Sequence, residues 1–117
     1  MNGEKLYALI NEYLGFKVFM MSVETNVNEV EFIFYDSFLA ICGTGESCDR
    51  FYVKIGVGNT YISEFLGQTC LSAVDEESIK SSLDIVDQYC RLRLPDRYLE
   101  KYEQEYKMVD GSRRMNV

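Results

Sequence analysis

The sequence predicts an α+β domain, in which an antiparallel β-meander of four or five strands carries one N-terminal and two C-terminal helices. Apolar residues recur at helical spacing at the start of the chain and again after Leu71. Between these regions lie short aromatic and β-branched segments, separated by Gly, Asn and Asp. Strands in one block with helices at both ends are typical of two layers, with the helices packed on one face of the sheet.

The first helix is predicted over residues 3–14. Its apolar residues follow the i, i+3, i+4, i+7, i+8 spacing of one helical face, and Gly15 stands where a C-cap glycine belongs. The residues of this face are Leu6, Leu9, Ile10, Tyr13 and Leu14.

A first strand is predicted over residues 16–23. This segment is nearly all apolar, which is typical of a strand covered on both faces. Residues 24–29 then read as a turn, and aromatic and β-branched residues predict further strands over 30–35 and 38–42.

Residues 51–57 predict a half-buried strand because apolar and polar side chains alternate along them. Gly58-Asn59 is a two-residue turn signal, so residues 60–66 form the expected return strand. One side of the 51–57 strand would carry Phe51, Val53, Ile55 and Val57, and the other Tyr52 and Lys54.

A second helix is predicted over residues 76–92, with Asp75 as its N-cap. Pro95 interrupts the helical pattern, which resumes as a third helix over 96–109. Three tyrosines recur along this last helix at i, i+4, i+8, which is typical either of the edge of a core or of a contact surface. They are Tyr98, Tyr102 and Tyr106. We expect one domain over 1–110 and a flexible tail over 111–117.

The charge of the chain is acidic and unevenly placed. The net charge is −7, and residues 1–90 carry fourteen acidic against five basic residues. Because such a body repels phosphate backbones, it argues against nucleic-acid binding and favours a basic partner. The N-terminus does not resemble a signal peptide and no continuous apolar stretch is long enough to span a membrane, so we expect a cytoplasmic protein without membrane contact.

The composition argues against most catalytic and metal sites. The chain has no histidine, which excludes Ser-His-Asp and Cys-His catalysis within it and the common histidine-based metal sites. The four cysteines include no C-x-x-C pair, and a cytoplasmic protein would keep them reduced. We therefore expect no catalytic residue, no metal and no cofactor.

Residues 41–50, ICGTGESCDR, resemble a site at first sight. A phosphate-binding loop would need a lysine and a following helix, whereas acidic residues and a strand follow here. A redox pair of Cys42 and Cys48 is conceivable, but the charges nearest Cys48 are mostly negative. A glycine-bearing hairpin loop with an acidic tip is the better interpretation.

The chain resembles, in size, acidity and lack of catalytic groups, the immunity proteins of bacterial polymorphic-toxin and contact-dependent inhibition systems. This resemblance implies a non-catalytic protein that binds a basic toxin domain, such as a nuclease, and neutralises it. The acidic partner-binding candidates are Glu24, Glu29, Asp36, Glu46, Asp49 and Glu64, and the aromatic anchors are Tyr52 and Tyr61. Two alternatives stay open: a homodimeric regulatory or adaptor domain, and a small-molecule-binding or cysteine/carboxylate enzyme.

Overall fold

The computed structural model describes residues 1–44, 50–69 and 72–107. Its elements in chain order are α1 (Gly3–Leu14), the short 3-10 helix η1 (Gly15–Lys17), β1 (Val18–Glu24), β2 (Glu29–Phe34), β3 (Phe38–Gly43), β4 (Tyr52–Val57), β5 (Thr60–Ile62), β6 (Glu64–Phe65), β7 (Gln68–Thr69), α2 (Glu76–Leu92) and α3 (Asp96–Lys107). The predicted α+β class, with a five-stranded antiparallel sheet, one N-terminal helix and two C-terminal helices, is confirmed.

Local capping chemistry sets the bounds of the first two helices. The Asn2 side chain accepts a hydrogen bond from the backbone N–H of Lys5, and Gly15 ends α1 with a φ of 55°. The Asp75 carboxylate caps α2 by accepting from the backbone N–H of Ser78. This contact holds the pKa of Asp75 below its usual range, because hydrogen bonds stabilise the charged form. The predicted bounds 3–14 and 76–92 are both confirmed.

The main sheet is a simple meander in the order β1-β2-β3-β4-β5. The prediction that residues 16–23 form a strand covered on both faces is wrong. Phe16 belongs to η1, β1 is an edge strand, and Met21 is 48% exposed at a register shift between Met20 and Ser22. Val18 and Met20 are buried whereas Met21 and Ser22 are exposed, so β1 is covered on one face only.

Two other strand predictions also need correction. Tyr35 was expected at the end of a strand, but it lies in the β2–β3 turn with a φ of 51°.

The single strand predicted over 60–66 divides at Ser63 into β5 and β6. β5 pairs with β4 in the main sheet, whereas β6 pairs with β7 in a separate hairpin. Phe65 of this hairpin is buried and meets the Tyr89 ring of α2 edge-on, at 5.0 Å between ring centroids. The hairpin therefore leaves the sheet in order to bury Phe65.

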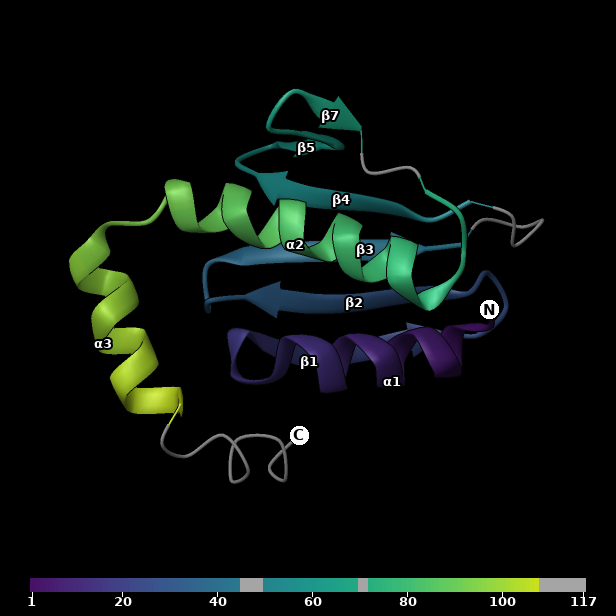
Figure 1. The fold of residues 1–117 in the computed structure, drawn as a ribbon, viewed down its shortest axis with the longest axis horizontal. Helices are drawn as coiled ribbons and strands as arrows, with labels where there is room; N and C mark the ends of the chain where they lie inside the picture. The colour runs from purple at the N-terminus through teal and green to yellow at the C-terminus, as the bar shows by residue number, and fades with distance from the viewer. Residues whose placement is uncertain (45–49, 70–71, 108–117) are drawn as a thin grey trace.

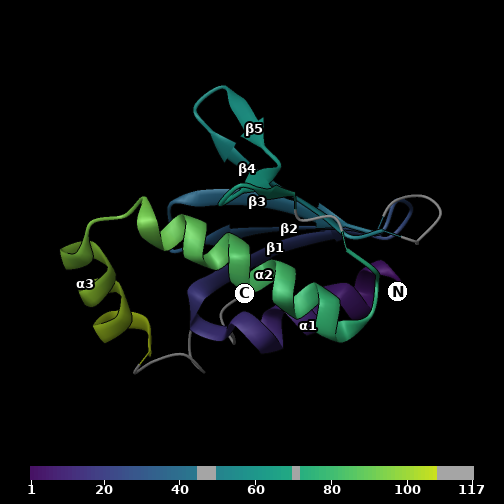
Figure 2. The same cartoon turned by 45° about the horizontal axis from the view of Figure 1, so that its top comes forward.

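Helices α1 and α2 lie side by side on one face of the sheet, as both views of the ribbon show (Figures 1 and 2). The core lies between these two layers, and each of its fully buried large side chains contributes about 1.5–3 kcal/mol by leaving water. Its central residues include Leu6, Ile10, Val30, Phe32, Phe34, Ile55, Ile79, Leu83 and Val86.

Helix α3 lies beyond the end of the sheet, at the left of Figure 1, and tyrosine hydroxyls attach it to the body. The Tyr98 hydroxyl donates to the backbone oxygen of Tyr35 at 2.5 Å, and that of Tyr102 donates to the backbone oxygen of Phe16 at 2.6 Å. Tyr102 is buried and its ring contacts both Tyr98 and Tyr106. Of the two interpretations of the tyrosine stripe, the edge of a core therefore describes Tyr102. Residues 108 and 109 of the predicted helix, and the predicted tail, lie outside the described residues.

A polar network connects α2 to its surroundings at the same end of the sheet. The buried Tyr35 hydroxyl donates to Asp87, whose other oxygen lies 3.0 Å from Lys17 Nζ. Arg91 donates a hydrogen bond to the hydroxyl oxygen of Tyr35 at 3.3 Å and forms an ion pair with Glu103 of α3 at 3.1 Å. Burial, followed by the hydrogen bond to Asp87, raises the pKa of Tyr35, so its hydroxyl stays protonated.

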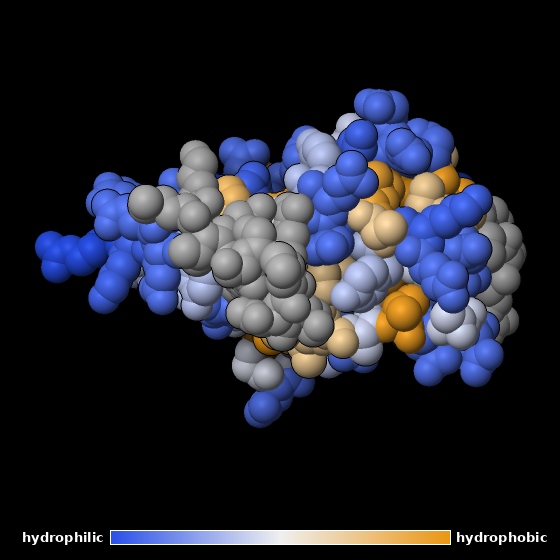
Figure 3. Space-filling model, turned by 90° about the horizontal axis from the view of Figure 1, so that it is seen from below, coloured by the Kyte–Doolittle hydropathy of each residue, from blue (hydrophilic) through white to orange (hydrophobic). Residues whose placement is uncertain are grey.

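No helix in the described ranges combines the length and the apolar composition needed to cross a bilayer. Viewed from below, on the side of α1 and β1, apolar residues form separate patches framed by hydrophilic ones (Figure 3).

Candidate functional site

The two faces of the main sheet have different surroundings. Along β2, Val30, Phe32 and Phe34 are buried beneath the helices, and the residues between them point the opposite way. No helix among the described residues covers that opposite side (Figure 2). We call it the open face; the strand registers place on it Phe19, Ser22, Glu24, Glu29, Glu31, Ile33, Leu39, Ile41, Gly43, Tyr52, Lys54, Gly56 and Tyr61.

One end of the open face is apolar. Phe19, Ile33 and Leu39 are register neighbours on β1, β2 and β3, and all three are partly exposed. Tyr61 on β5 extends this row and is 56% exposed. We call these four residues the apolar half. A solvated sheet face ordinarily carries polar side chains, so a partly exposed apolar row is the mark of a contact surface.

The other end of the open face is acidic. Glu24 and Glu29 are direct register partners on β1 and β2, and Glu31 follows two residues along β2 on the same face. We call these three residues the acidic half. The two ion pairs among the described residues, formed by Lys17 and Arg91, involve none of them. Since like charges opposite each other destabilise a sheet by about 0.2–1 kcal/mol, this arrangement is unfavourable in the free protein.

Two tyrosines of the open face lie over glycines of the neighbouring strand. Gly43 is the register partner of Tyr52, and a Cβ added to Gly43 would lie 2.7 Å from the Tyr52 hydroxyl oxygen. This close approach lets the Tyr52 hydroxyl reach across β3 and donate to Glu29. Burial, followed by this hydrogen bond, raises the pKa of Tyr52. Gly56 and Tyr61 form the second pair, with a looser contact of 3.6 Å to the added Cβ.

Half of the partner-binding residues predicted from the sequence lie on the open face. Glu24, Glu29 and Tyr52 occupy one register row, which crosses the sheet at the acidic end. Tyr61 lies at the apolar end of the same face. The structure thus brings together the strand-end acids with one predicted aromatic anchor, and places the second at the opposite end.

The other four predicted residues lie elsewhere. Asp36 is in the β2–β3 turn, where it lines a hollow against α3, and Glu64 is on β6 in the separate hairpin. Neither is on the open face. Glu46 and Asp49 lie outside the described residues.

Sequence reasoning missed Glu31 and three residues of the apolar half, Phe19, Ile33 and Leu39. The signal was present, because apolar residues occupy both alternating sets of positions in β1 and β3. In a meander with few helices, an apolar set on each side means that one of them faces solvent or a partner. For residues 16–23 this pattern predicted burial on both faces instead.

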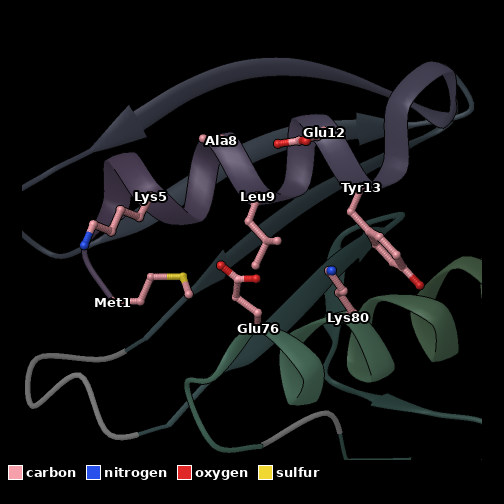
Figure 4. A pocket seen from close by; sticks show the side chains of 8 residues that line it. All are labelled: Met1, Lys5, Ala8, Leu9, Glu12, Tyr13, Glu76 and Lys80. Carbon is pink, nitrogen blue, oxygen red and sulfur yellow. The ribbon is translucent and has the colours of Figure 1, made fainter.

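A second hollow lies between α1 and α2 (Figure 4). It has a volume of about 520 Å³ and is lined by Met1, Lys5, Ala8, Leu9, Glu12, Tyr13, Glu76 and Lys80. Leu9 points into it from α1, and the Glu76 carboxylate faces it from α2. At one end the Tyr13 hydroxyl donates to Asp84 at 2.8 Å, which raises the pKa of Tyr13. The lining side chains carry two lysine ammonium groups and two carboxylates, so these side chains select neither anions nor cations.

The cysteines within the described residues are unreactive by environment. Cys42 and Cys90 are buried free thiols. Burial raises the pKa of Cys42 well above its usual range and that of Cys90 to about 12. Because the thiolate is the reactive form, these side chains behave as core residues at neutral pH. Cys48, the partner of Cys42 in the conceivable redox pair, lies outside the described residues.

Comparison with known proteins gives no relative of this chain: no family model, no curated protein and no solved structure matches it.

Proposed function

We propose that this chain is a non-catalytic protein-binding domain that binds a basic protein through the open face and neutralises it, as an immunity protein neutralises a toxin domain. The observation that carries the proposal is the open face itself, where partly exposed apolar residues adjoin three acids that form no ion pair with any described residue. Apolar area supplies affinity and charge supplies steering and selectivity in such interfaces.

The dimensions of the open face fit the central part of a protein interface. Five strands spaced about 4.8 Å apart give a width of about 19 Å between the outer strands, and four residues along β2 give about 13 Å. A standard interface buries about 800 Å² on each partner, so the partner also extends onto the surrounding strand ends. A basic partner is favoured by the net charge of −7 and by the acidic half.

The homodimeric alternative through the tyrosine stripe has less support. Tyr102 is 3% exposed and its hydroxyl is engaged with Phe16. A residue committed to the body of its own domain offers little area to a second copy.

Affinity capture from cells of the source organism tests the proposal. The immobilised chain should retain a protein with a basic domain, and the variant Ile41→Arg, at the centre of the open face, should not. Leu92→Arg is the matched control, because Leu92 is 69% exposed on α2, away from this face. Identification of the retained protein by mass spectrometry gives the partner.

Two further measurements decide the role. The Kd for the captured basic domain should weaken at least about tenfold between 50 and 500 mM salt, since screening removes charge attraction. Co-expression of the chain should suppress the toxicity of that domain in a bacterial host. Binding that ignores salt, or toxicity that persists on co-expression, would contradict the proposed function.

A further inference from the structure

The open face is chemically divided, and this division specifies the partner surface that fits it. Resting on the proposed function, we infer that the partner surface has an apolar centre that lies on the apolar half, together with arginine or lysine side chains that lie on the acidic half. The separation between the two groups on the partner is about 7–13 Å, the distances from Ile33 to Glu31 and to Glu29 along β2.

The acidic half specifies cations because no ion pair with a described residue offsets its repulsion. Glu24 faces Glu29 directly across the β1–β2 ladder. Lys54 is the basic residue of the open face and lies in the register row of Glu31, with Ile41 between them. Its ammonium lies over the Tyr52 ring, 5.7 Å from the ring centroid. Arginine or lysine from a partner supplies the missing opposite charge, and arginine can pair with a carboxylate in a bidentate manner.

Tyr52 prepares this corner for binding before the partner arrives. Its ring lies over Gly43 and its hydroxyl donates to Glu29, so both the ring and the carboxylate are already held in place. Tyrosine offers a large contact area with little conformational entropy to lose.

A second copy of the chain does not complement this surface. Each copy carries a net charge of −7, and two-fold pairing of open faces would set acidic halves against either acidic or apolar halves. The apolar half without the acids would accept many surfaces, whereas the two halves together select a basic one.

The test uses a probe of defined chemistry. The ¹⁵N-labelled chain is titrated with a nine-residue peptide that carries leucine at positions 1 and 3, arginine at positions 5 and 7 and serine elsewhere, so that an extended strand presents leucine and arginine on one side. It is titrated separately with peptides in which glutamate replaces arginine or serine replaces leucine. We expect the arginine–leucine peptide to shift amide resonances of β1 to β4 and to bind at least about tenfold more tightly than either comparison peptide. Equal binding of the glutamate–leucine peptide would overturn the assignment of cations.

Matched variants locate the two halves. Glu31→Lys and Ile33→Ser should each weaken the Kd of the arginine–leucine peptide at least about tenfold. Glu100→Lys on α3 and Leu92→Ser on α2 make the same chemical changes on exposed positions elsewhere, and each should change it less than about threefold. Equal effects of Glu31→Lys and Glu100→Lys would show that overall acidity alone attracts the peptide, and would overturn the inference. If circular dichroism shows that Ile33→Ser has lost its fold, Leu39→Ser makes the same test on β3.

The inference and the proposed function fail in different ways. If the peptide binds both halves but no partner in the source organism is neutralised, the inferred docking surface stands and the proposed function is wrong. A neutralised partner whose Kd ignores Glu31→Lys and Ile33→Ser would retain the role and overturn this surface. Analytical ultracentrifugation tests for a second copy on the open face. Self-association that is lost in Ile33→Ser would also overturn the inference, because the occupant would then be a second copy of the chain.

Discussion

Alanine should be strongly destabilising at Gly43 and harmless at Gly56, although both glycines lie on the open face beneath a tyrosine. A Cβ at Gly43 would lie 2.7 Å from the Tyr52 hydroxyl oxygen and 2.9 Å from the backbone oxygen of Asn28. Contacts this short cannot exist, so both the Tyr52 ring and the β1–β2 turn must move, or β3 must shift away from both. A Cβ at Gly56 would lie no closer than 3.6 Å to any such neighbour, which is ordinary van der Waals contact.

The expected free energies follow from these contacts. Overpacking costs about 1–3 kcal/mol, and moving the Tyr52 ring also weakens its hydrogen bond to Glu29, which is worth about 1.5–3 kcal/mol as a bond to a charged group. Moving the ring relieves the overpacking but weakens the hydrogen bond, so the two costs do not add in full. We therefore expect Gly43→Ala to lower the free energy of unfolding by about 2–4 kcal/mol. Gly56→Ala should raise it by up to about 1 kcal/mol, because alanine restricts the unfolded chain.

Urea denaturation followed by circular dichroism measures both values. The variant Gly43→Ala/Tyr52→Ala completes a double-mutant cycle that isolates the contribution of the ring from that of the Asn28 carbonyl. A Gly43→Ala protein within about 0.5 kcal/mol of the parent would refute the close approach of Tyr52. So would a Gly56→Ala protein destabilised as much as Gly43→Ala, because glycine as such would then be the requirement.

Three further predictions concern the buried groups. Tyr35→Phe removes a donor to the buried Asp87 carboxylate and should lower the free energy of unfolding by about 1–3 kcal/mol, measured by urea denaturation; an unchanged value would place that hydroxyl outside the network. The pKa of Cys90 is raised to about 12, so as pH rises the thiol loses its proton in the unfolded chain before it does so in the folded one. The free energy of unfolding should therefore fall between about pH 8.5 and 12, by up to about 1.4 kcal/mol per pH unit from this group. Cys90→Ala should flatten that fall in urea titrations at pH 8 to 11, and an equally steep fall would contradict the assignment. Tyr102→Phe removes the hydrogen bond to the Phe16 carbonyl and should speed amide exchange selectively in α3, by about five- to tenfold for a loss of about 1 kcal/mol. Mass spectrometry of exchanged peptides measures the exchange rates, and unchanged protection of α3 would contradict the prediction.

The sequence predicted the helices better than the sheet because helix ends are set locally. Asn2, Gly15 and Asp75 act on groups within a few residues of themselves, so the bounds of α1 and α2 could be read directly. The division of residues 60–66 at Ser63 depends on a distant contact instead, the seat of Phe65 against Tyr89. Nothing near Phe65 in the sequence contains that information.

The candidate site was half predictable for the same reason. Strand-end acids such as Glu24 and Glu29 stand out in the sequence, and the meander brings these two together as register partners. Whether Ile33 points toward a helix or toward solvent depends on which face the helices cover, and periodicity does not encode that choice. The pairing of Gly43 with Tyr52 required the register of β3 and β4.

The two glycine–tyrosine pairs also restrict how this sequence can evolve. A side chain at position 43 needs a smaller residue at position 52 and a shift of the β1–β2 turn away from it. Changes at positions 43 and 52, nine residues apart, are therefore expected to occur together. Gly56 and Tyr61 make a looser couple five residues apart and can change independently. A distant homologue is therefore expected to retain Gly43 with Tyr52 as a unit, or to lose both, even where the surrounding strand residues have diverged.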